Sequence, residues 1–205
     1  VLQNSVYVSS IGAFIIMLSA ITIASSSKVH ANKSMRIAGN LSAAGYAFPG
    51  TMLAIGVLSC LGAVDQLLSW TSIYLSGTLF ALFFAYLVRF QAVGYGAVSS
   101  GLTKIPLNLM SCSRSLGLNA QQTTLRVTIP LIQKSIIAGA VLAFVDIMKE
   151  LPMTLLLRPF NFETLATYSY QFAHDELMDQ ASLPALIIIV VGLVPVIFLN
   201  KLLCA

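Results

Sequence analysis

An acid, a base and a second acid occur within one helical turn, at Asp146, Lys149 and Glu150, directly after a hydrophobic stretch. Ionisable side chains near a membrane boundary are expensive and usually face a cavity or one another, and Asp146 and Lys149 can pair at i,i+3 spacing. Pro152 then breaks the helix, which leaves 153–166 as irregular or re-entrant backbone. The pattern indicates a pathway or gate for a charged solute. The alternative is a cluster that only anchors a helix end at the interface.

The other residue types that commonly do chemistry are scattered. Cys60, Cys112 and Cys204 have no paired spacing for zinc and no even count for a disulfide framework. His30 and His174 each lack a second ligand at i+4, so we interpret them as loop residues. The sequence has no P-loop lysine motif and no paired-carboxylate or His/Asp cluster within its hydrophobic stretches. We therefore expect no metal site, no resident cofactor and no catalytic site.

A long polar stretch, 91–130, separates two hydrophobic segments, and ordered connections of this length are usually functional. Its apolar residues allow two short amphipathic helices, with Gly117 as a flexible stop between them and Pro130 in the first turn of the next span. The residues that give this pattern are Leu109, Leu116, Leu125 and Ile129. Two interpretations remain open at this point, a solvated connector and a functional docking element.

The composition places these stretches in a membrane protein. Of the 205 residues, 58% are hydrophobic and 9% are charged, with a mean hydropathy of +0.89, whereas soluble domains are about 45–50% apolar and about 25% charged. A membrane-spanning helix needs about 20 mostly apolar residues. We expect one all-α domain over 1–205, a polytopic bundle of about five transmembrane helices at 6–24, 46–63, 72–88, 131–148 and 183–203.

Basic and acidic residues alternate between the two sides of this expected bundle. One side holds nine basic residues and no acids: Lys28, Lys33, Arg36, Arg89, Lys104, Arg114, Arg126, Lys134 and Lys201. Short basic loops are cytoplasmic, so Val1 is expected outside. Charges spread over loops between hydrophobic spans do not favour a nucleic-acid surface. The sequence begins at Val1 rather than at a methionine, as expected of a piece of a longer protein.

The stretch 111–130 resembles the cytoplasmic loop of permeases of binding-protein-dependent ABC importers. That family's order of a glycine, nine residues, an aliphatic, any residue, an aliphatic and a proline occurs here at Gly117, Val127, Ile129 and Pro130. Where the family has Glu-Ala-Ala, this chain has the small residues Ser111, Cys112 and Ser113, without the acid. The resemblance implies that the loop sits in a groove of an ATPase subunit and transmits its closure on ATP.

The stretch 144–166 resembles the ferric iron branch of that family more closely than its molybdate, sulfate or sugar branches. It contains Lys149-Glu-Leu-Pro152 and Thr154-Leu-Leu-Leu-Arg-Pro159, and the likeness extends over nearly all of 41–200. It corresponds to the carboxy-terminal half of proteins in which two such halves are often fused. It implies the type I ABC-importer permease fold and an outer gate or re-entrant segment at about 149–182. The residues expected to form the pathway or gate are Asp146, Lys149, Glu150, Pro152, Thr154 and Arg158.

The resemblance also implies a non-enzymatic transport subunit that moves ferric iron across a bacterial inner membrane. The implied partners are an ABC ATPase that binds ATP, a periplasmic ferric-iron-binding protein, a second permease half and the lipid bilayer. Two alternatives remain: a permease for another small solute, such as thiamine, molybdate, sulfate or a polyamine, and a secondary transporter. A secondary transporter is expected to place ionisable or unwound segments at mid-membrane, and the expected spans are nearly uncharged.

Overall fold

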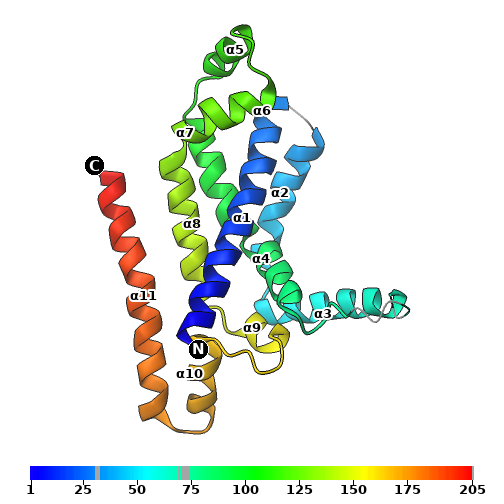
Figure 1. The fold of residues 1–205 in the computed structure, drawn as a ribbon, viewed down its shortest axis with the longest axis vertical. Helices are drawn as coiled ribbons and strands as arrows, with labels where there is room; N and C mark the ends of the chain where they lie inside the picture. The colour runs from blue at the N-terminus through cyan, green and yellow to red at the C-terminus, as the bar shows by residue number, and fades with distance from the viewer. Residues whose placement is uncertain (31–32, 69, 71–73, 205) are drawn as a thin grey trace.

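The computed structural model describes residues 1–30, 33–68, 70 and 74–204, and all the regular elements in these ranges are helical (Figure 1). Three long helices form the centre of the bundle: α1 (Leu2–His30), α4 (Leu79–Thr103) and α8 (Gln133–Met148). α2 (Lys33–Ala47) packs on α1 and α4, and α11 (Met178–Cys204) packs on α8. The all-α fold class is confirmed.

Shorter elements lie at the two ends of this bundle. At one end, α5 (Leu107–Ser115), α6 (Ala120–Thr123), a π-helical turn (Thr124–Thr128) and α7 (Ile129–Leu131) connect α4 to α8. Toward the other end, where α1 begins, lie α3 (Gly50–Leu67), α9 (Pro152–Leu157) and α10 (Leu165–His174). The two segments that the sequence singles out are therefore at opposite ends of the molecule (Figure 1).

Among the described residues, α1, α3, α4 and α11 are long and apolar enough to cross a membrane. A fifth span results if 120–131 and α8, which meet at an angle of 77°, are counted as one. The number of spans agrees with the prediction, but their boundaries differ, most of all for the third span. α4 occupies Leu79–Thr103 instead of 72–88, so the polar stretch predicted to begin at 91 begins only after Thr103.

α2 was not predicted, since residues 25–45 were expected to form a connection between the first two spans. Small residues let this helix approach its neighbour closely, as is common where helices pack in membranes. An ideal Cβ on Gly45 would lie 2.0 Å from the carbonyl oxygen of Val88, and one on Gly39 would lie 2.3 Å from the hydroxyl oxygen of Tyr95. Both contacts are with α4, so these glycines bring the two helices together.

Gly45→Ala is therefore expected to destabilise the protein by about 1–3 kcal/mol, the usual cost of forcing an extra methyl group into a packed site. The clash is with backbone, which cannot rotate away. The melting temperature of the purified protein in detergent measures the effect. Gly56→Ala is the matched control, because no atom lies within 4 Å of its Cβ position. Equal melting temperatures for the two variants would contradict the close approach of α2 and α4.

An apolar core holds α9 in place beside α3 and α4. Met153 and Leu157 are fully buried in α9, and they belong to the same cluster as Ala54 of α3 and Leu82 and Tyr86 of α4. Burying one such apolar side chain contributes about 1.5–3 kcal/mol. The short helix after the α8 corner is therefore part of the packed bundle, and it fixes the position of the polar residues around it.

Candidate functional site

The end of the bundle between α4 and α8 carries a helical hairpin, α5 followed by α6. Gly117 lies between the two helices with a φ of +86°, a conformation that L side chains rarely adopt. The amide of Leu118 donates to the carbonyl of Ser113 at 3.2 Å, which is the six-residue bond of a Schellman motif with glycine just past the helix end. Asn119 then caps α6 in a capping box with Gln122. Two helices with Gly117 as the stop were predicted, and this is confirmed.

Side-chain contacts join the hairpin internally. The hydroxyls of Ser113 and Thr123 are buried and lie 3.2 Å apart, and Thr128 donates to the carbonyl of Thr123 at 3.4 Å. The remaining predicted residues of this segment are at least partly accessible: Ser111, Cys112 and Pro130 are exposed, and Val127 and Ile129 are half-buried. The segment is thus one ordered unit that presents a surface at the end of the molecule.

The corner between α8 and α9 contains the residues predicted to form the outer gate. Pro152 occupies the first turn of α9, where its missing N–H is not needed. The prediction of irregular backbone over 153–166 is therefore wrong for 153–157 and for 165–166, which are helical, and it applies to 158–164. Thr154 is buried, and its hydroxyl donates to the carbonyl of Glu150 at 2.7 Å and contacts the hydroxyl of Tyr86.

The charged residues of the predicted gate form three separate ion pairs. Lys149 pairs with Asp146 at 2.9 Å, as their i,i+3 spacing predicts. The hydrogen bond to Asp146 is the main cause that raises the pKa of Lys149, so this ammonium stays protonated. Arg158 pairs with Glu163 on the loop that follows α9. Glu150 makes its ion pair with neither Lys149 nor Arg158 but with Arg89 of α4.

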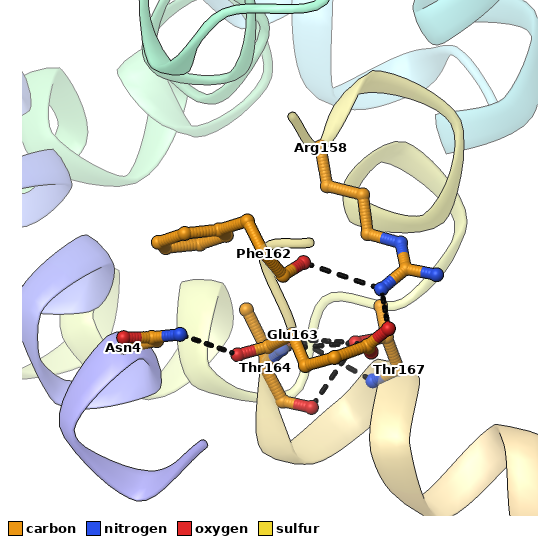
Figure 2. A network of polar contacts seen from close by, with 6 residues as sticks. All are labelled: Asn4, Arg158, Phe162, Glu163, Thr164 and Thr167. Atoms are coloured by element: carbon orange, nitrogen blue, oxygen red, sulfur yellow. Dashed lines mark hydrogen bonds and ion pairs between the residues drawn. The ribbon is translucent and has the colours of Figure 1, made fainter. Parts of the chain in front are cut away.

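Figure 2 shows how the loop 158–164 is held. The Arg158 guanidinium contacts the Glu163 carboxylate and donates to the carbonyl of Phe162 at 3.2 Å. The Asn4 amide of α1 donates to the carbonyl of Glu163 at 3.0 Å, and Thr164 caps α10 in a capping box with Thr167. The loop is therefore held by bonds within itself and by a bond to the beginning of α1. Asn4 and Glu163 are 159 positions apart in the chain, so the sequence could not indicate this contact.

Glu150 is paired with Arg89, a residue that the sequence analysis placed in a cytoplasmic loop. That placement is wrong, because Arg89 lies inside α4, about 15 Å along the helix from Leu79 at 1.5 Å per residue. Its Nη1 atom is 3.8 Å from Oε1 of Glu150, which is only 8% exposed. The signal that could have found Arg89 is the apolar periodicity of the span, which continues beyond the arginine to Leu102.

This arrangement consists of a packed helical bundle, an ordered hairpin at one end and a charged corner toward the other. Residues 7–204 match the family described as the inner membrane component of binding-protein-dependent transport systems. The chain belongs to this family. It is thus the membrane-spanning permease component of a binding-protein-dependent transport system and a multi-pass inner-membrane protein. Membership decides against the secondary-transporter alternative.

One curated relative is the Fe(3+)-transport system permease protein FbpB 2 of Haemophilus influenzae, to which this permease is 25% identical over 160 residues. The match covers 76% of this chain and 29% of that protein, so most of the relative lies outside it.

Solved structures of ABC transporters share the fold. One is a bacterial transporter involved in alginate import, with a TM-score of 0.78 and 18% identity over 98% of this chain and 77% of that one. Another is the MetNI methionine transporter, with a TM-score of 0.70 and 16% identity over 97% and 89% of the two chains. Identities this low establish the fold and leave the substrate open.

Proposed function

We propose that this permease translocates ferric iron, delivered by a periplasmic binding protein, using ATP hydrolysed by a partner ATPase. The observation that carries the iron assignment is the similarity to the Fe(3+)-transport permease over 76% of the chain. The carboxylate of Glu150, buried in a membrane protein beside a helix corner, supports it, because intramembrane carboxylates commonly belong to ion pathways. Asp146, Lys149, Pro152, Thr154 and Arg158 complete the outer gate in this proposal.

The hairpin from 107 to 131 is the ATPase-docking element in this proposal, with Ser111, Cys112, Ser113, Gly117, Val127, Ile129 and Pro130 as its residues. Two leucines support a docking role, since Leu116 is 84% exposed and Leu125 is 64% exposed on the ordered hairpin. Apolar side chains presented at the end of a protein are typical of contact sites. A second permease half, fused or separate, completes the transporter.

Uptake of radioactive iron tests the substrate. The permease is produced with its ATPase and binding protein in cells that lack other iron importers, and uptake is compared with that in cells whose ATPase subunit cannot hydrolyse ATP. We expect ATP-dependent accumulation of iron that excess thiamine, molybdate, sulfate or polyamine does not reduce. ATP-dependent uptake of one of these solutes in radioactive form, with no accumulation of iron, would assign the permease to that solute instead.

The proposed orientation places Cys112 in the cytoplasm. In a variant without Cys60 and Cys204, a membrane-impermeant thiol reagent is expected to leave Cys112 unlabelled in intact cells and to label it in inverted vesicles, since Cys112 is exposed. Asp175→Cys in a cysteine-free background is the matched control, because Asp175 is exposed at the opposite end, between α10 and α11. It should be labelled in intact cells. Rapid labelling of Cys112 in intact cells would overturn the orientation.

A further inference from the structure

The Arg89–Glu150 pair lies where two helix breaks meet the side of α4. The chain turns between α2 and α3 at Gly50, and it turns again between α8 and α9 after Glu150. An ideal Cβ on Gly50 would lie 2.1 Å from Nη1 of Arg89 and 2.9 Å from Oε1 of Glu150. Both breaks therefore touch the same pair of side chains, and a Cβ at position 50 would require the guanidinium or the carboxylate to shift.

The backbone at Glu150 is firmly held on one side of this pair. Its carbonyl accepts from the Thr154 hydroxyl, which in turn contacts the hydroxyl of Tyr86 on α4. The carboxylate accepts from the amide of Met153 at 3.3 Å. Tyr86 and Arg89 are spaced i,i+3 and lie on the same face of α4. That helix thus contacts the corner twice, once through a hydroxyl and once through a charge.

The contact between the two charges is looser than the contacts around it. At 3.8 Å it is an ion pair without a hydrogen bond. Nε and Nη1 of Arg89 are buried, and neither donates to any of the described residues. Buried donors normally have acceptors. Electrostatic attraction and the ring of Phe90, whose centroid lies 5.7 Å from the guanidinium carbon, therefore hold the guanidinium beside the carboxylate. The carboxylate can exchange this partner and keep its bond to the amide of Met153.

We infer that Arg89 is a positioning residue: it holds the Glu150 carboxylate at the junction of the two helix breaks and gives way to the cationic substrate. With the site empty, the pair carries no net charge, which suits a low-dielectric surrounding where a lone carboxylate is costly. A cation that reaches Glu150 takes the place of the guanidinium. This inference rests on the proposed function, because it takes Glu150 as the group that meets the cation.

A mutant cycle in the complete transporter, with ATPase, binding protein and second half, tests this. The variants are Arg89→Gln, Glu150→Gln, both together, and Arg89→Lys. Each single Gln variant leaves one uncompensated charge and is expected to lower the melting temperature. The double variant removes both charges with little change in volume and should recover stability. Its iron uptake should stay at the reduced rate of Glu150→Gln alone, because Arg89 acts through Glu150. Arg89→Lys keeps the charge and should recover part of the uptake.

Three results would overturn the role of Arg89. A double variant that transports at the wild-type rate would make the pair purely structural. If the two single substitutions lower the rate of iron uptake by certain factors and the double variant is slower by their product, Arg89 acts independently of Glu150. An unchanged melting temperature in Arg89→Gln would mean that no such pair exists in the folded protein. Should the wild type move no iron, the substrate assignment fails first, and the melting temperatures still decide whether the pair forms.

Discussion

Gly117→Val is expected to lower stimulated ATP hydrolysis about tenfold or more, a change equivalent to about 1.4 kcal/mol, while the permease still inserts into the membrane. Gly117 has a φ of +86°, and non-glycine residues in such conformations cost about 1–3 kcal/mol. A β-branched side chain is also the stiffest choice. The chain can relieve this strain by giving up the bond from Leu118 to Ser113, which redirects α5 relative to α6. Docking on the ATPase then fails although the membrane helices are intact.

Two further variants separate this effect from the mere presence of valine. Gly96→Val places the same residue in α4, where Gly96 is exposed and no atom lies within 4 Å of its Cβ position. A transporter that contains this variant should show ATP hydrolysis by its ATPase at close to the wild-type rate. Gly117→Asn should give an intermediate rate, because asparagine tolerates the left-handed conformation better than other non-glycine residues. Unchanged coupling of Gly117→Val in reconstituted vesicles would count decisively against a docking role for the hairpin.

The hairpin could be predicted because local rules determine it. A glycine between two short apolar patterns indicates a helix end with left-handed geometry, and the structure has that end at Gly117. Pro130 likewise lies in the first turn of α7, just before α8. Such features depend on a few neighbouring residues, so the sequence specifies them without any knowledge of the tertiary contacts.

The pairing of Arg89 with Glu150 and the position of α2 could not be predicted, because both depend on contacts between distant parts of the chain. A charged residue after an apolar run usually marks the end of a span, but here the charge is compensated by Glu150, which is distant in sequence. That partner offsets the charge of Arg89 inside α4. α2 is not apolar enough to be recognised as a span, and it is placed by glycines that approach α4, as Gly45 does at Val88. Hydropathy registers neither kind of contact.

The local structure of the residues proposed to form the outer gate was predicted in part. The pair of Asp146 and Lys149 follows from helical spacing alone. The pairing of Glu150 with Arg89 does not, because Arg89 lies on another helix, 61 positions earlier in the chain. Pro152 was expected to end a helix, yet it begins α9. A proline is compatible with both outcomes, and the burial of Met153 and Leu157 decides between them.

Glu150→Gln is expected to reduce the rate of iron uptake by about tenfold or more. This corresponds to a rise of about 1.4 kcal/mol or more in the activation free energy of transport. The substitution keeps the side-chain volume and removes the attraction for a strongly charged cation. Pathway sites must bind weakly enough to release their ion, so slower transport is expected rather than loss of a tightly bound metal. Uptake of radioactive iron, divided by permease abundance on a blot, measures the effect. The division matters because removing one partner of a buried ion pair can cost about 3–5 kcal/mol of stability.

The matched control is Glu176→Gln, which makes the same chemical change on an exposed carboxylate between α10 and α11. Its uptake should equal that of the wild type, because an exposed carboxylate attracts cations only weakly through solvent. Lys149→Met tests the neighbouring pair with Asp146, and slower uptake is expected there too if that pair belongs to the gate. Wild-type uptake by both Glu150→Gln and Lys149→Met would leave these charges with the role of anchoring the end of α8 at the membrane interface, and the iron pathway would have to pass elsewhere.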